Sequence, residues 1–142
     1  MSATEQMAPV ALADGDEGPT KTVGPLVRMD FVRYAGAGGD FNPMHTDEEF
    51  AKSAGMPSVF GHGLLTAGIG SVYLAEWVGR TNVRKYGFRL ASQVWPGDEL
   101  TFRGKVERVH QEDGTQLADL SIVATRQTGE PALTATATVV AS

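Results

Sequence analysis

The hydrophobic pattern of the chain changes near residue 82, and the change separates a helical part from a strand part. From Asn82 onward apolar and polar residues alternate with a period of two, most clearly over Leu100–Glu107 and Leu133–Ala141. Such alternation is typical of strands with one buried face, and the intervening Asp113-Gly114 and Thr128-Gly129 pairs are typical of hairpin turns. We therefore expect an antiparallel meander with strands near 84–92, 98–110, 117–127 and 131–141.

The part before residue 82 predicts mainly helices. We expect a short strand over 21–27 and helices over 31–35, 47–54 and 62–78. Asp30 would cap the first helix, which ends in a run of glycines, and the run Thr46–Glu49 matches a capping box for the second. In the third helix apolar residues surround nearly the whole circumference, which predicts burial on all sides. Helices followed by a meander indicate an α+β fold, in which an antiparallel sheet wraps around a long central helix.

Residues 1–20 show no sustained period and contain no aromatic side chain. They carry four acidic residues and no Lys or Arg, and so account for four of the five net negative charges. We predict a flexible acidic tail over 1–20 and one packed domain over 21–142. The tail lacks the basic and apolar regions of a secretory signal, and no apolar stretch is long enough to span a bilayer. These features predict a cytoplasmic protein without membrane insertion.

Composition excludes several classes of function. The 142 residues include no cysteine, which rules out disulfides, thiolate metal sites and cysteine nucleophiles. A net charge of −5 argues against dedicated nucleic-acid binding. The phosphate-binding loop, the dinucleotide-binding glycine motif and the G-x-S-x-G serine-hydrolase motif are all missing from the sequence.

The segment Asp40–His45 combines a carboxylate, an amide (Asn42) and an imidazole within six residues. On a regular helix Asp40 and His45 would point about 140° apart, because each residue turns about 100°, and Pro43 disfavours that helix. A curled loop would instead direct both side chains to one point, where a carboxylate and an imidazole form a natural pair for proton transfer. A solvated loop that caps a helix explains the same residues without chemistry.

Gly61-His62-Gly63 stands directly before the longest predicted helix. A free backbone N–H at a helix start can stabilise negative charge on a carbonyl oxygen, aided by the helix dipole, and glycine lets a ligand approach the backbone closely. A plain turn with a hydrogen-bonded histidine is the alternative. Ser71, deeper in the helix, could be an ordinary hydroxyl bonded to the preceding turn.

Four of the 12 Lys and Arg residues fall within ten positions, namely Arg80, Arg84, Lys85 and Arg89. In an acidic chain this concentration could receive a phosphate-bearing ligand, although one charged strand face is the simpler explanation for any single member. The Asp and His residues near position 45 lack the spacing of a helical metal site. We therefore predict neither a metal ion nor any other cofactor.

Taken together, residues 34–65 resemble the signature of the MaoC-like family, the type 2 (R)-specific enoyl-thioester hydratases. That signature is a tyrosine-led stretch of small residues, then G-D-x-N-P-x-H-x-D, then A/G-H-G-[ML]-L. The chain carries YAGAGGDFNPMHTD and, further on, GHGLL. Among subfamilies it is most similar to the single-hotdog β subunit of the actinobacterial (3R)-hydroxyacyl-carrier-protein dehydratases. It departs from the family at Gly38, where a Ser or Thr is common.

The resemblance implies a single hotdog fold over residues 21–142 and reversible syn hydration of trans-2-enoyl thioesters to (3R)-3-hydroxyacyl thioesters. Asp40 and His45 would form the catalytic pair, and the Gly63 N–H would polarise the thioester carbonyl. Asn42 and Ser71 match positions that support the substrate site.

Single hotdog domains of this family pair side by side. The resemblance therefore implies a homodimer, or a heterodimer with a related hotdog subunit, and a substrate bound to CoA or to acyl carrier protein. In such pairs an acyl tunnel runs along the subunit interface. Arg84 and Lys85 would then lie near the mouth of this tunnel and contact CoA phosphates or an acidic carrier protein. A hotdog thioesterase and a non-catalytic partner subunit are the alternatives, and the intact Asp40 and His45 argue against both.

Overall fold

The alternating segments form one five-stranded antiparallel sheet in the computed structural model, which describes residues 6–142. The strands are β1 (Lys21–Val23), β2 (Val83–Leu90), β3 (Leu100–Glu112), β4 (Thr115–Arg126) and β5 (Pro131–Val140). Their order across the sheet is β1-β3-β4-β5-β2, which confirms the meander for β3, β4 and β5. The expectation that β2 belongs to the same meander is wrong, because β2 pairs with β5 at the far edge of the sheet and not with β3, the next strand along the chain. The β3–β4 turn is tight because Asp113 and Gly114 both have positive φ, 49° and 78°.

The helices are α1 (Arg28–Gly38), α2 (Glu48–Ser53) and α3 (Gly63–Val78), with short 3-10 turns η1 (Pro43–His45) and η2 (Arg80–Asn82). α1 is longer than expected and runs through its glycines until Gly39, whose φ of 75° ends the helix. The Asp30 carboxylate lies inside the first turn, where it accepts the Val27 N–H at 2.8 Å. α2 begins one residue later than the capping-box interpretation predicts, because Asp47 is the cap and accepts the Phe50 N–H at 3.1 Å.

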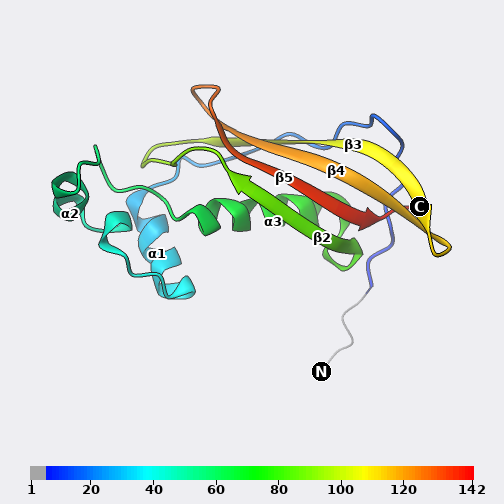
Figure 1. Ribbon diagram of the computed structural model, residues 1–142, viewed down its shortest axis with the longest axis horizontal. Coiled ribbons are helices and arrows are strands. Elements are labelled where there is room, and N and C mark those ends of the chain that lie inside the picture. The colour runs from blue at the N-terminus through cyan, green and yellow to red at the C-terminus, as the bar shows by residue number, and fades with distance from the viewer. Residues whose placement is uncertain (1–5) are drawn as a thin grey trace.

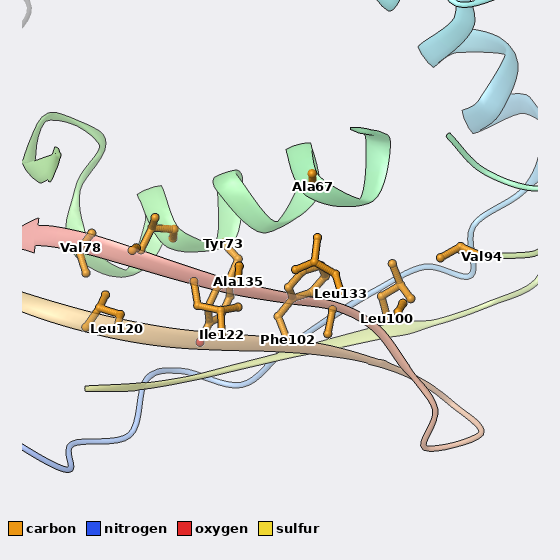
Figure 2. Close-up of a cluster of buried hydrophobic side chains, with 14 of the residues drawn as sticks. Ala67, Tyr73, Val78, Val94, Leu100, Phe102, Leu120, Ile122, Leu133 and Ala135 are labelled. Atoms are coloured by element: carbon orange, nitrogen blue, oxygen red, sulfur yellow. The ribbon is translucent and has the colours of Figure 1, made fainter. Parts of the chain in front are cut away.

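α3 lies along one face of the curved sheet, as Figure 1 shows. The core fills the space between them, and in Figure 2 Tyr73 and Val78 from α3 lie close to the strand residues. The rings of Tyr73 and Phe102 stack with centroids 5.7 Å apart, and Phe102 is fully buried beside Leu133. This is the expected sheet wrapped around a central helix.

The expectation that α3 is buried on all sides is wrong for the single chain. Leu64 is 60% exposed and Val72 is 51% exposed. One sheet can cover only one face of a helix, and the remaining apolar face has no cover within residues 6–142. No helix in the same residues is long and apolar enough to cross a membrane.

The structure corrects the prediction of a flexible tail for residues 6–20, while residues 1–5 lie outside the described residues. The Gly15 N–H donates to the Val106 carbonyl at 2.8 Å, and the Val106 N–H donates to the Asp16 carbonyl at 2.8 Å. The Gly18 N–H donates to Gly104 at 2.8 Å. The segment therefore continues the β1 edge of the sheet along β3.

Acidic and apolar contacts both hold this N-terminal segment. The Asp14 carboxylate accepts the Val109 N–H at 2.6 Å, and the Pro19 carbonyl accepts the Tyr73 hydroxyl at 2.6 Å. Gly18 lies against the Trp77 ring, and a Cβ there would lie 2.8 Å from a ring carbon. The prediction of a flexible tail was wrong because main-chain hydrogen bonds need no hydrophobic period. The acidic side chains act as hydrogen-bond acceptors instead of keeping the segment in solvent.

Candidate active site

The loop between α1 and α2 brings Asp40 and His45 together. The Asn42 side chain accepts the Met44 N–H at 3.1 Å and so caps η1, which Pro43 begins with its fixed φ. The Asn42 N–H donates to Asp40 Oδ1 at 3.2 Å. These local bonds curl the chain and leave Asp40 Oδ2 3.8 Å from His45 Nε2.

The His45 imidazole has a defined tautomer. Its Nδ1–H donates to the Phe60 carbonyl oxygen at 2.7 Å, so Nε2 carries the lone pair of the neutral ring and faces Asp40. A separation of 3.8 Å is too long for a direct hydrogen bond, so a small molecule can be held by both groups. The two differ in environment, because the Asp40 side chain is 56% exposed and that of His45 only 10%.

Gly63 is the first residue of α3, and within residues 6–142 no group accepts its N–H. This donor lies at the positive end of a helix of 16 residues. It borders a cavity of about 350 Å³ lined by Phe60, Gly61, Gly63, Thr66 and the segment 90–94. A Cβ on residue 63 would lie 2.2 Å from Leu90 Cδ1, so glycine at this position lets the Leu90 side chain pack against the start of α3.

The segment 94–98 anchors the loop that precedes α3, a role that the sequence did not indicate. The Gly61 N–H donates to the Val94 carbonyl at 2.8 Å. Asp98 in turn fixes the segment that contains Val94, since its Oδ2 accepts the Trp95 N–H at 2.8 Å and Arg126 Nε at 2.7 Å. Burial opposes ionisation of Asp98, but bonds from Arg126, Trp95 and the Gln127 amide outweigh it and lower the pKa. In the sequence, only the turn residues around position 97 mark this segment. The contact of Asp98 with Arg126 gives no local signal, because Arg126 lies at the end of β4.

The structure leaves three predicted site residues away from the Asp40–His45 pair. Ser71 is exposed on α3, two turns beyond Gly63, and its hydroxyl donates to the Gly68 carbonyl at 2.7 Å. Arg84 and Lys85 are exposed near the start of β2, about 20 Å along the strand from Leu90 at about 3.3 Å per residue. The roles assigned to these residues and to Asn42 stay predictions.

Asp40, His45 and His62 lie close enough to suggest a metal site, with one ligand atom from each within 4.8 Å of the others. The two imidazole rings, however, are stacked with centroids 3.8 Å apart and planes inclined at 30°. The nitrogen lone pairs of an imidazole lie in the plane of its ring. Two ring planes that face each other in this way do not meet at zinc–nitrogen distances of about 2.0–2.1 Å from both rings. The arrangement does not suit a single metal ion.

Comparison with known proteins gives one family. The family model described as "MaoC like domain" matches residues 7–127. Among curated relatives, enoyl-CoA hydratase ChsH3 of Mycobacterium tuberculosis is 41% identical over 66 residues, which cover 44% of this chain and 23% of that protein. 3-Hydroxyacyl-thioester dehydratase Y of the same organism is 33% identical over 97 residues, 66% of this chain and 33% of that protein. The chain thus spans a third or less of these relatives.

Solved structures are similar to this chain over nearly its whole length. A MaoC-like dehydratase has a TM-score of 0.84 at 34% identity, over 94% of this chain and 43% of that chain. The ChsH1–ChsH2 complex from Mycobacterium tuberculosis has a chain with a TM-score of 0.77 at 25% identity, over 92% of this chain and 98% of that one. The expected α+β hotdog architecture is confirmed.

Proposed function

Since the chain belongs to the MaoC-like domain family, we propose that it catalyses reversible hydration of trans-2-enoyl thioesters to (3R)-3-hydroxyacyl thioesters. The observation that carries the proposal is the Asp40–His45 pair, whose two polar atoms lie 3.8 Å apart, close to the loop that leads to the Gly63 N–H. Related proteins named enoyl-CoA hydratase and 3-hydroxyacyl-thioester dehydratase support the same reaction class.

The proposed reaction adds water across the C2–C3 double bond. The water oxygen forms a bond to C3, one water proton passes to the Asp40–His45 pair, and a proton from the pair reaches C2. Hydroxyl and hydrogen add to the same face because one pair handles both protons. No oxidation occurs and no group leaves, so the step needs no cofactor.

The Gly63 N–H would supply the electrostatic part of catalysis. As C3 is attacked, negative charge builds on the thioester oxygen in an enolate-like transition state. A preorganised donor that meets this charge is worth about 10²–10³ in rate. The cavity beside Gly63 gives the thioester carbonyl room to reach the N–H.

A spectrophotometric assay separates this function from its alternatives. With crotonyl-CoA as substrate, a hydratase bleaches the enoyl absorbance without releasing free thiol, whereas a thioesterase releases thiol. A non-catalytic partner subunit does neither. Thiol release without loss of the enoyl band would contradict the proposed reaction.

We further propose that the protein works as a dimer, with an identical copy or with a related hotdog subunit. The uncovered apolar face of α3 is continued on β2, where Phe88 is 43% and Leu90 is 46% exposed. β2 is also an edge strand, with one side unpaired by any strand of the described residues 6–142. Pairing of two β2 strands around a twofold axis would extend the sheet and cover the apolar face. An active monomer of about 15.1 kDa in light scattering would contradict this assembly.

Such a pairing would also bring the basic residues of β2 close to the cavity of the other subunit. Antiparallel partners exchange ends, so Arg84 and Lys85 of the partner subunit would lie beside Leu90 and Gly63 of the first. A substrate carried by CoA or by an acidic carrier protein would meet these cations at the cavity entrance. The distance that separates Arg84 from the pair within one chain is then no obstacle.

A further inference from the structure

We propose that His62 is a positioning residue for the Asp40–His45 pair, an inference that rests on the proposed hydration activity. Its Nε2 lies 3.0 Å from the backbone carbonyl oxygen of Asp40. A carbonyl can only accept, so His62 is the donor and its ring proton sits on Nε2. This bond crosses from the start of α3 to the loop that carries the carboxylate.

The same ring also fixes the second member of the pair. The His62 and His45 imidazoles are stacked with centroids 3.8 Å apart. On His45 the Nδ1–H is bound to Phe60, so the stack restrains the remaining freedom, which is tilting of the ring plane. Tyr34 packs on His62 at 4.9 Å and helps hold it in place. His62 therefore ties the main chain at Asp40 and the ring of His45 to one rigid point.

The His62 side chain is part of the protein interior. His62 is 2% exposed, and its Nδ1 is buried without a hydrogen-bond partner among residues 6–142. An apolar side chain of similar size would avoid that unpartnered nitrogen, so packing alone does not explain a histidine here. The bond from Nε2 to Asp40 does explain it. His62 is also the residue before Gly63, so the anchor holds the pair in a fixed relation to the Gly63 N–H.

The test compares two amides of nearly equal polarity. In His62→Gln the side-chain amide nitrogen can occupy the place of Nε2 and keep the bond to Asp40. In His62→Asn the amide is shorter and reaches only the place of Nδ1. We expect the Gln variant to keep kcat within about 3-fold of the wild type, and the Asn variant to lose about 10-fold to 10²-fold in kcat, because small misplacement of reacting groups has effects of this size. KM should change little in both. Equal kcat in the two variants would overturn the proposal.

Hydrogen exchange gives a readout that does not depend on turnover. The His45 amide donates to the Asn42 carbonyl at 3.1 Å inside the positioned loop. It should exchange faster in the Asn variant than in the Gln variant, while the amide of Leu74 in the core of α3 stays equally protected in both. Equal loop exchange in the two variants would overturn the positioning role. If the wild type fails to hydrate any enoyl thioester, the proposed function falls while this comparison still decides the role of His62.

A measurement on the wild type guards against a variant that does not fold. Long-range proton–nitrogen NMR spectra of the histidine side chains report which ring nitrogen carries the proton. The proposal requires the Nε2–H tautomer for His62 and the Nδ1–H tautomer for His45. An Nδ1–H tautomer at His62 would remove the donor and overturn the proposal.

Discussion

His45 and Phe60 are joined by a hydrogen bond of 2.7 Å from the imidazole Nδ1–H to the main-chain carbonyl. Phe60 belongs to the loop that leads to Gly63, so this bond links the Asp40–His45 pair to the start of α3. A carbonyl partner on Nδ1 keeps the Nε2 lone pair directed at the position shared with Asp40.

Loss of either member of the pair should impair chemistry without loss of fold. We expect Asp40→Asn and His45→Ala each to lower kcat for enoyl-thioester hydration by at least about 10², since general acid–base groups contribute about 10²–10⁴. Asp47→Asn is the matched control, because Asp47 caps α2 and Asn is an equally good cap. Steady-state kinetics and circular dichroism check the result. Near-normal turnover in both pair variants would remove these residues from the mechanism.

Gly63→Pro should abolish activity in a folded protein. Proline deletes the N–H, yet it is well tolerated at the first position of a helix, and the preceding residue His62 has φ −59° and ψ 135°, which proline accepts. Gly63→Ala keeps the N–H but pushes on Leu90, so we expect a partial loss. Adding Leu90→Ala should restore part of the activity of the Ala variant and none of the Pro variant. Full activity in a folded Pro variant would refute the donor role.

Deletion of residues 2–20 should destabilise the protein. Among the contacts that the deletion removes are five hydrogen bonds, those of Asp14, Gly15, Asp16 and Gly18 with β3 and that of Pro19 with α3. At about 0.5–1.5 kcal/mol per bond, the loss of these five should lower the free energy of unfolding by about 2–7 kcal/mol. Tyr73→Phe, which removes only the bond to Pro19, should cost about 1 kcal/mol. Urea denaturation measures both, and an unchanged midpoint after the deletion would show that the segment does not pack in solution.

Asp98 should make stability depend on acid pH. Its pKa in the folded protein is lowered from the ordinary 3.8. A lowered carboxyl pKa gives stability that is fully present above the unfolded value and is lost as the pH falls through the folded value. We therefore expect the difference in free energy of unfolding between the wild type and Asp98→Asn to be constant above about pH 5 and to shrink below about pH 4. Chemical denaturation at a series of pH values checks this, and a difference independent of pH would contradict it.

Charge reversal on β2 should affect substrate binding more than turnover. We expect Arg84→Glu combined with Lys85→Glu to raise KM with little change in kcat, the pattern of lost uniform binding. The effect should shrink at high salt because exposed charges are screened. Arg103→Glu with Lys105→Glu, an equal charge change on β3, is the control and should leave KM nearly unchanged. Equal KM in both double variants would reject the placement of Arg84 and Lys85 at the substrate entrance.

The elements that could be predicted from the sequence are those whose signals are local. Alternation gave the strands, turn residues such as Gly114 gave the hairpins, and the Asp40–His45 spacing with Pro43 gave a curled loop. Each of these depends on residues a few positions apart. The identity of the family was also evident from residues 34–65, because its motifs are short and contiguous.

The features that escaped prediction depend on partners distant in sequence. Nothing near Gly15 indicates that its N–H meets Val106, and nothing near Asp98 indicates Arg126. The same applies to His62, whose partner Asp40 lies 22 residues earlier. The exposed face of α3 was missed for the opposite reason, since an apolar circumference predicts burial but does not say whether the cover comes from the same chain.

The uncovered apolar face of α3 connects stability to protein concentration. Leu64 and Val72 stand in water in the isolated chain, so covering them in the proposed dimer would favour the folded state by mass action. The thermal midpoint should then rise as the protein is concentrated. Since Leu64 directly follows Gly63, the same equilibrium would set the fraction of molecules with a complete site, and specific activity would fall on dilution.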